Sequence, residues 1–387
     1  MLYLDNAATT PVLEAALRAA WPWLTTEFGN PSSTHELGLR AKAALDEARA
    51  SVAASLGAKS SEVVFTSGAT EANNLAIKGL ALANPRGRHI VSSPTEHESV
   101  LQAIDHLVRI HDFEVTWLPV GRDGLVTTDA LLSVIRPDTT LVALMWVNNE
   151  TGAMAPIAEI AEACRQVDVP LHVDAVQAVI HETVDVSDIA CTSLALSGHK
   201  LGAPKGSGAL FVRSGSHIEP LLSGGGQEAG QRSGTENVAW AVAFAVALDI
   251  RVKNRGKALA FDSDAFIERV LREVPGAQLS GDRASRSPLI ASFVFEGVAG
   301  ETVLLELERR GVICSSGSAC AAGRDEPSHV LTAMGLDADL ARTAVRFSFT
   351  PVLAEWPSTA PGANQEVTND SLDEVVEALR EIVTSLR

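Results

Sequence analysis

The feature that most constrains the fold is a regular alternation of apolar strand-like segments and helical segments, from about residue 60 to about residue 215. The strand-like segments are Glu62–Thr66, His89–Ser92, Glu114–Leu118, Thr140–Val147, Leu171–Val173, Ser193–Leu196 and Gly208–Val212. Helix-compatible segments lie between several of them, at Thr70–Leu82, Ser99–Ile110, Thr128–Ile135 and Ile157–Cys164. This alternation predicts a mostly parallel sheet covered by helices on both faces.

The C-terminal part of the chain has a different pattern, which predicts a smaller α+β domain. A glycine-rich segment from Ser223 to Thr235 closes the first region. Beyond it we expect helices at Val238–Lys257, Glu301–Arg310 and Ser371–Leu386, and strands at Leu289–Phe295 and Ala344–Phe349. The proline-containing stretch Leu353–Asp370 is predicted to be a surface loop. A length of 387 residues also exceeds the size at which a single core usually stops growing.

The charge and the apolar segments exclude several classes of protein. The 31 basic and 48 acidic residues give a net charge of −17, which repels nucleic-acid phosphates and anionic lipid. The longest apolar stretches, Thr139–Val147 and Ala239–Leu248, are too short to span a bilayer and are expected to be a buried strand and a buried helix. Without a signal-peptide pattern, CxxC pair or zinc spacing, we expect a cytoplasmic protein with reduced cysteines and no metal.

Lys200 lies in the motif Ser197-Gly-His-Lys200, directly after the strand Ser193–Leu196. Open α/β sheets bind ligands beyond the carboxyl ends of their strands. A lysine that is desolvated there becomes a nucleophile able to form a Schiff base. Because a single lysine is ordinarily a solvated loop residue, neighbouring motifs must support this interpretation.

Asp174 ends the preceding apolar strand, in the motif His172-Val-Asp174. A carboxylate that faces a pyridinium nitrogen is the usual protein partner in pyridoxal-phosphate (PLP) sites. Gln177 follows three residues later, within reach of the ring hydroxyl from the same turn. The alternative for Asp174 is an N-cap of the next segment.

The segment Thr66-Ser-Gly-Ala-Thr-Glu71 predicts a strand that runs through a glycine turn into a helix. Backbone N–H groups and hydroxyls at a helix N-terminus bind anions, which suits a cofactor phosphate. The segment is not a nucleotide P-loop, because no GxxxxGK[ST] is present. A simple capping box at Ser67 is the alternative.

Cys320 is surrounded by small residues in the segment from Cys314 to Gly323. Such a thiol is expected to be sterically accessible, as a reactive cysteine must be, although it is equally compatible with a filler residue of a loop. Cys164, Cys191 and Cys314 lie in apolar settings and are assigned to structure.

With these pieces in this order, the chain resembles the cysteine desulfurases of the NifS/IscS-like group in the class V aminotransferase family. The similarity runs from Leu4 to Ser348. The motifs that carry it are Leu4-Asp-Asn-Ala-Ala-Thr-Thr-Pro11, Phe28-Gly-Asn-Pro-Ser32, Thr66-Ser-Gly-Ala-Thr-Glu71, Thr95-Glu-His97, Val147-Asn-Asn-Glu-Thr-Gly152, His172-Val-Asp174, Ser197-Gly-His-Lys200, Arg232-Ser-Gly-Thr235, Ser315-Ser-Gly-Ser-Ala-Cys320 and Arg346-Phe-Ser348. The segment that ends in Cys320 discriminates best, because related transaminases lack it.

The resemblance implies a PLP site and a role for each matching residue. Lys200 would hold PLP covalently and move protons, and His97 would stack on the ring and carry protons. Asp174 would meet the ring nitrogen, and Gln177 the ring hydroxyl. The phosphate would be held by the backbone of Ala69 and by Thr70, Ser197 and His199, with Thr235 reaching it from the other subunit of a homodimer. Asn149 and Arg346 would bind the substrate carboxylate, for which the planar fork of arginine is suited.

The resemblance also implies PLP-dependent transferase fold type I, with the active site at the dimer interface. Residues 13–255 would form the large domain with a seven-stranded sheet. Residues 1–12 and 256–387 would form the small domain that carries Cys320. The chain departs from the family after Ser348, where Phe349-Thr-Pro-Val352 and the loop to Asp370 replace a short turn. We also expect no longer tail of the kind that some members use to dock a scaffold protein.

The expected reaction converts L-cysteine to L-alanine and leaves the sulfur on Cys320 as a persulfide. A sulfur-acceptor protein would then take it for iron–sulfur clusters, another sulfur-containing cofactor or nucleic-acid modification. The alternatives are a selenocysteine lyase or another β-eliminating enzyme of the same fold, an aminotransferase, and a non-catalytic scaffold for sulfur carriers. Neither the identity of the acceptor nor the need for an activating protein follows from the sequence.

Overall fold

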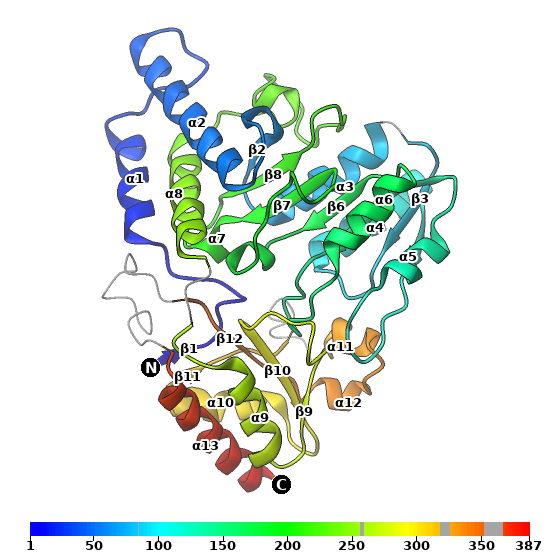
Figure 1. Cartoon of the computed structure of the whole chain (residues 1–387). Coiled ribbons are helices and arrows are strands. Elements are labelled where there is room, and N and C mark those ends of the chain that lie inside the picture. Colours follow the sequence, from blue (N-terminus) through cyan, green and yellow to red (C-terminus); the bar gives the residue numbers. More distant parts are fainter. Residues whose placement is uncertain (84, 256–258, 318–325, 352–366) are drawn as a thin grey trace.

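The computed structural model describes residues 1–83, 85–255, 259–317, 326–351 and 367–387 (Figure 1). Cys320 and most of the predicted loop 353–370 therefore lie outside the described residues. A seven-stranded sheet occupies the upper part of the view, and two smaller sheets lie in the lower part.

The large sheet contains all seven strands predicted from the alternating pattern. They are β2 (Val63–Thr66), β3 (His89–Ser92), β4 (Glu114–Trp117), β5 (Thr139–Met145), β6 (Leu171–Asp174), β7 (Ser193–Ser197) and β8 (Gly208–Val212). Their order is β2-β8-β7-β6-β5-β3-β4. Only β8 is antiparallel to its neighbours, so the prediction of a mostly parallel sheet is confirmed.

Helices cover both faces of this sheet, because its central strands carry apolar side chains on both sides. In the fully buried strand β5, Leu141 and Ala143 belong to one apolar cluster, with residues of α3 and α4. Val142 and Leu144 point the other way, into the main core that includes α6 and α8. The helices of this part are α1 (Glu14–Thr25), α2 (Glu36–Ser55), α3 (Ala69–Ala83), α4 (Glu98–His111), α5 (Thr128–Val134), α6 (Ile157–Gln166), α7 (Gly198–Leu201) and α8 (Val238–Asn254).

The rest of the chain forms the two smaller sheets and the helices that pack on them. The strands are β1 (Leu2–Tyr3), β9 (Ala277–Leu279), β10 (Ile290–Phe295), β11 (Val312–Ile313) and β12 (Val345–Ser348). The helices are α9 (Ser263–Glu273), α10 (Gly300–Arg309), α11 (His329–Ala333), α12 (Ala338–Ala341) and α13 (Asn369–Leu386). The predicted α+β character of this region is confirmed.

The last helix begins earlier than the sequence predicts. Thr368 is its N-cap and forms a capping box with Ser371, so Asn369 and Asp370 are helical and do not belong to a loop. A threonine that accepts the Ser371 N–H fixes the start of the helix at this point.

The N-terminal segment connects the two parts of the molecule. Strand β1 pairs with β11, and Asp5 pairs with Ser348 of β12. A few residues later, the Thr10 N–H donates to the His199 carbonyl at the large sheet. Residues 5–10 therefore lie between the small sheets and the carboxyl end of β7. The division into residues 13–255 and residues 1–12 with 256–387 agrees with this arrangement and stays a prediction.

Among the described residues, no helix combines the length and the apolar character that crossing a membrane requires.

Candidate active site

The predicted site residues come from one edge of the large sheet. Asp174 ends β6, and Lys200 lies in α7 directly after the adjacent parallel strand β7. Because both strands run in the same direction, their carboxyl ends meet at the same edge. His97 follows β3 and Thr70 follows β2, and these strands also end there.

Lys200 directs its amine at the N-terminal segment. Its Nζ donates to the carbonyl oxygens of Ala7 and Ala8, the latter at 2.6 Å. Gln177 is buried, and its Nε2 donates to the same Ala7 carbonyl at 3.1 Å. Lys200 and Gln177, which the resemblance assigns to different groups of PLP, thus both donate to the carbonyl oxygen of Ala7.

Asp174 is a buried carboxylate, 6% exposed, and both of its oxygens have partners. Oδ1 accepts the Val176 N–H at 3.0 Å. Asp174 is not the N-cap that was the alternative for it, because Gln177 is the N-cap of the next helical turn, Ala178–Ile180. Oδ2 accepts a hydrogen bond from Asn73 Nδ2 of α3 at 2.7 Å. The same Nδ2 donates to Ser99 Oγ at 2.8 Å, and this hydroxyl lies 2.8 Å from His97 Nδ1. A chain of polar contacts therefore joins Asp174 to His97.

The orientation of Asn73 is fixed by a buried histidine. His172 Nε2 lies 3.0 Å from Asn73 Oδ1, and His172 Nδ1 lies 2.8 Å from Ser193 Oγ. Burial lowers the pKa of His172 to about 3, so its ring is neutral near pH 7. Because the amide oxygen only accepts, His172 Nε2 carries the proton of this bond and the NH₂ group of Asn73 faces Asp174.

His97 is the N-cap of α4, where its Nδ1 accepts the Ser99 N–H at 3.1 Å. An accepting Nδ1 places the proton of the neutral ring on Nε2. Sequence reasoning found His97 through the family motif alone, and its capping role explains how α4 fixes the ring's position.

The turn between β2 and α3 has the features of an anion site. Gly68 has a φ of +149°, and a Cβ added there would meet no heavy atom of the described residues within 4 Å beyond its chain neighbours, so the turn is open at this point. The 15-residue helix α3 begins at Ala69 and Thr70, where the first-turn N–H groups lack intrahelical partners. Glu71 accepts the Ser67 N–H at 2.8 Å and Arg232 Nε at 2.7 Å, which braces the turn from the glycine-rich segment.

Two further residues predicted to bind phosphate flank Lys200. Ser197 is buried at the end of β7, and the half-buried His199 has its Nδ1 3.2 Å from Thr9 Oγ1. Burial, followed by the charges of Lys200 and Lys205, lowers the pKa of His199 to about 4. A neutral imidazole retains one N–H that can donate to an anion.

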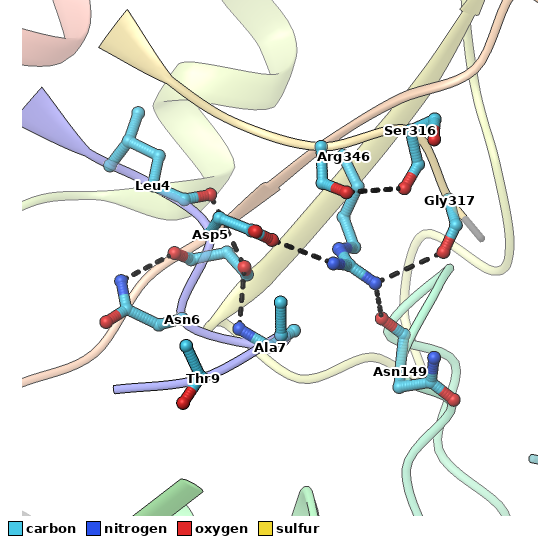
Figure 2. Close-up of polar contacts among 12 residues, drawn as sticks. Leu4, Asp5, Asn6, Ala7, Thr9, Asn149, Ser316, Gly317 and Arg346 are labelled. Atoms are coloured by element: carbon cyan, nitrogen blue, oxygen red, sulfur yellow. Dashed lines mark hydrogen bonds and ion pairs between the residues drawn. The ribbon is translucent and has the colours of Figure 1, made fainter. Parts of the chain in front are cut away.

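Arg346 lies on β12 and is 1% exposed (Figure 2). Its Nη1 donates to the carbonyls of Asn149 at 2.9 Å and Gly317 at 3.2 Å. Its Nη2 forms an ion pair with Asp5 Oδ1 at 2.9 Å. The structure thus brings together the two residues predicted for the substrate carboxylate, Arg346 and Asn149, and adds an aspartate that the sequence analysis did not single out.

No hydrogen bond joins Thr235 to the other predicted site residues that the structure describes. Thr235 is exposed and lines, with Thr66, Ser67 and Arg232, a cavity of about 260 Å³ beside the turn at Gly68. Cys320 lies outside the described residues.

The three described cysteines are poor nucleophiles. Burial raises the pKa of the thiol to about 12 for Cys164 and to about 11 for Cys191, and raises that of Cys314 further still. Their predicted structural role agrees with this burial.

Sequence reasoning missed Asn73, Ser99 and Asp5. For Asn73 a signal was present, because this polar residue lies among Ala72, Leu75 and Ala76 on the apolar side of a helix. Asp5 lies in the first motif of the family resemblance, but nothing local indicated its pairing with Arg346, which is 341 residues away in the chain.

Comparison with known proteins gives a consistent result over the whole chain. The aminotransferase class-V family matches residues 2–354. The cysteine desulfurase IscS of Dictyoglomus turgidum is 40% identical over 385 residues, which are 98% of this chain and 96% of that protein. Among solved structures, a NifS-like protein has a TM-score of 0.86 at 30% identity and 99% coverage of both chains. A structure of SspA in complex with cysteine has a TM-score of 0.81 at 37% identity, covering 91% of this chain and 99% of that one.

The fold and the site define a PLP-dependent enzyme of fold type I. The chain belongs to the class-V aminotransferase family.

Proposed function

We infer that this chain is a PLP-dependent cysteine desulfurase that converts L-cysteine to L-alanine and transfers the sulfur to Cys320. One observation carries the inference. Lys200 and Asp174 follow neighbouring parallel strands beside the anion-binding turn at Gly68, in a chain whose full-length relatives are named cysteine desulfurases.

The residues present fit PLP. The group has an aldehyde, a ring nitrogen and a phosphate, and the site offers an amine, a carboxylate and a helix N-terminus beside the turn at Gly68. Lys200 would hold the group covalently, Asp174 its ring nitrogen and Gln177 its ring hydroxyl, with His97 stacked on the ring. Ala69, Thr70, Ser197 and His199 would hold the phosphate. When bound, PLP supplies a protonated ring that accepts the electrons of a broken Cα–H bond.

Arg346 and Asn149 would orient the substrate by its α-carboxylate. The guanidinium is buried where the N-terminal segment and β12 meet. Low exposure strengthens its attraction for a carboxylate and fixes the position of the substrate's Cα.

Lys200 and His97 would move protons. The Lys200 amine, displaced by the amino group of the substrate, would remove the Cα proton. His97 presents Nε2–H while its Nδ1 is held by Ser99, and would donate a proton to the carbon fragment as alanine forms.

Cys320 would receive the sulfur. Its thiolate attacks the substrate's Sγ, the new S–S bond forms, and the Cβ–S bond breaks with its electron pair left on carbon. Carbon takes up a proton and leaves as alanine, while the transferred sulfur is oxidised to the persulfide level. The buried Cys164 and Cys191 and the half-buried Cys314 are unsuited to this role, because the pKa of each thiol is raised.

We propose a homodimer in the cytoplasm, in which Thr235 of each subunit reaches the phosphate of the other. The exposure of Thr235 supports this assignment. A sulfur-acceptor protein would take the persulfide sulfur for iron–sulfur clusters or for another sulfur-containing product.

The test is a visible spectrum of the purified protein, followed by addition of L-cysteine and assays for alanine and sulfide. We expect an absorption band near 400 nm, as lysine-bound PLP generally shows, and alanine formation with sulfide released only after a reductant cleaves the persulfide. Absence of the band after PLP is supplied would contradict the enzyme function and favour a non-catalytic scaffold.

The variant Cys320→Ser tests the sulfur transfer. It should keep the band and lose persulfide formation, whereas Cys164→Ser should behave like the wild type in both assays. Full alanine and sulfide release by Cys320→Ser would refute the assigned role and favour a selenocysteine lyase or a β-eliminating enzyme.

A further inference from the structure

The arginine proposed to bind the substrate carboxylate already carries a carboxylate of its own chain. Asp5 Oδ1 lies 2.9 Å from Arg346 Nη2, and Figure 2 shows the two side chains pointing at each other. The Arg346 side chain is 1% exposed and that of Asp5 is 19% exposed, so this pair is shielded from solvent far more than a surface ion pair.

The backbone holds Asp5 in this position. The Ser348 N–H donates to the Leu4 carbonyl at 2.7 Å, and the Ala7 N–H donates to Ser348 Oγ at 2.8 Å. Arg346 and Ser348 are two residues apart on β12, so their side chains lie on the same face of the strand. Hydrogen bonds to β12, the strand that carries Arg346, therefore hold Asp5 beside Arg346.

Asp5 does not saturate the guanidinium. Of the five N–H groups of an arginine, contacts with described residues use three, toward Asn149, Gly317 and Asp5. Among the described residues, Nε is buried without a hydrogen-bond partner. A second carboxylate that arrived at this guanidinium would pair with it, but it would also face the charge of Asp5.

We propose that Asp5 is a positioning residue that stands in for the substrate's α-carboxylate when the site is empty and competes with it for Arg346. This inference rests on the proposed function. Without substrate, Asp5 neutralises a buried cation and keeps Arg346 in its binding rotamer. With substrate, Asp5 lowers the affinity for the amino acid, because two carboxylates then share one guanidinium.

A purely structural role for Asp5 predicts something different. Asp5→Asn keeps the size of the side chain and one acceptor oxygen toward Arg346 Nη2, and removes the negative charge. If Asp5 only fastened the N-terminal segment, this variant would change folding stability and leave ligand selectivity as it was.

The experiment titrates the holoenzyme with L-alanine and with L-alaninamide, the same molecule without the carboxylate charge, and follows the visible band of the bound cofactor. We expect Asp5→Asn to bind L-alanine roughly five- to tenfold more tightly than the wild type does, as removal of one partly shielded like charge predicts. Its affinity for L-alaninamide should change less than about twofold. In turnover, the KM for L-cysteine should fall more than kcat changes.

The control is Asp105→Asn, which removes the charge of an exposed aspartate paired with Arg109 at 2.6 Å on α4. It should leave both affinities unchanged. If Asp5→Asn does not fold, Asp5→Ser gives the same comparison with a smaller uncharged side chain.

Equal or weaker binding of L-alanine by the uncharged variants would overturn the proposal, as would equal tightening of both ligands. These results are separable from failure of the proposed function. If the proposed function is wrong, the wild type itself will lack the cofactor band or will form no alanine from cysteine.

Discussion

At the scale of single residues, Asn73 organises the site although it is not expected to touch substrate. Its amide oxygen meets His172, and its amide nitrogen donates to both Asp174 and Ser99. One side chain therefore sets the position of the carboxylate that should meet the cofactor ring and of the hydroxyl that holds His97.

We predict that Asn73→Ala lowers the free energy of unfolding by about 2–4 kcal/mol, because it leaves several buried polar groups without partners. Cofactor affinity should also fall, since Asp174 loses its bond to α3. Urea unfolding of the apoprotein and titration with PLP measure the two effects separately. Unchanged PLP affinity in a folded variant would show that Asp174 does not need this support.

The neighbouring Asn74 provides a matched control. Its Nδ2 donates to backbone oxygens, of Thr70 at 2.9 Å and Ser99 at 3.4 Å, and not to Asp174. Asn74→Ala should cost about 0.5 kcal/mol or less and leave PLP affinity unchanged.

Which site residues could be predicted from the sequence depends on how local their signal is. Lys200 and Asp174 each follow an apolar strand, and the strand itself places them at the sheet edge. Asn73 and Asp174 are 101 residues apart in the chain, and Asp5 and Arg346 are 341 apart. Periodicity and spacing hold no information on such pairs, because the packing of whole elements brings them together.

At the scale of elements, the connection from β2 to α3 decides whether an anion can bind. Gly68 has a φ of +149°, which an L-residue with a side chain rarely adopts, and no described residue other than its chain neighbours comes within 4 Å of the place that its Cβ would take. Because Gly68 has no side chain, its backbone can adopt this φ, and an anion can approach the first turn of α3.

We predict that Gly68→Ala weakens PLP binding at least about tenfold and destabilises the fold by about 1–2 kcal/mol. The added methyl group would project beside the N-terminus of α3, where we expect the phosphate. Absorbance titration with PLP measures the affinity, and urea unfolding of the apoprotein measures the strain.

Gly215→Ala separates strain from access. Gly215 also has a positive φ, of +91°, and no described residue within 4 Å of an added Cβ beyond its chain neighbours. It lies after the C-terminal end of β8, whereas Gly68 lies beside Gly208 at the N-terminal end of that strand. It should destabilise the protein similarly without changing PLP affinity. Equal loss of affinity in both variants would argue against a phosphate site at Gly68.

The helices and strands that were not predicted from the sequence were missed for different reasons. Helix α2 had a usable signal, because Ala41, Leu45, Ala48 and Val52 recur at helical spacing, but it lies outside the strand–helix alternation on which the analysis was based. Strands β1 and β11 have two residues each. Segments that short become strands only because they pair with each other, so no local sequence pattern predicts them.

At the scale of the whole molecule, one face is unusually apolar for a surface. Large apolar side chains are exposed along α1, in the following turn and at the start of α2: Leu17, Trp21, Leu24, Phe28 and Leu39. Trp21 is 61% exposed and Phe28 is 72% exposed. Helices α1 and α2 lie beside α8, which begins three residues after Thr235 (Figure 1). A cavity of about 430 Å³ is lined by residues of α2 and of the glycine-rich segment.

These exposed side chains thus lie on or between helices that pack on α8, the helix that follows the residue proposed to act across the dimer interface. Contiguous exposed apolar side chains mark protein–protein contacts, and a second copy of the chain would cover them while delivering Thr235. We therefore predict that Trp21→Glu combined with Phe28→Glu yields a monomer, because two buried charges without partners strongly disfavour association.

Light scattering after size-exclusion chromatography measures the mass, and titration with PLP measures the consequence for the site. The monomer should bind PLP more weakly than the wild type does, since it lacks the partner's Thr235, while its far-UV circular dichroism stays that of a folded protein. Leu271→Glu changes a 40% exposed residue of α9, away from this face, and should remain dimeric with unchanged PLP affinity. A monomeric wild type, or a double variant that stays dimeric, would place the subunit contact elsewhere. A monomer with full PLP affinity would contradict the role of Thr235 across the dimer interface, because the phosphate would then be held within one chain.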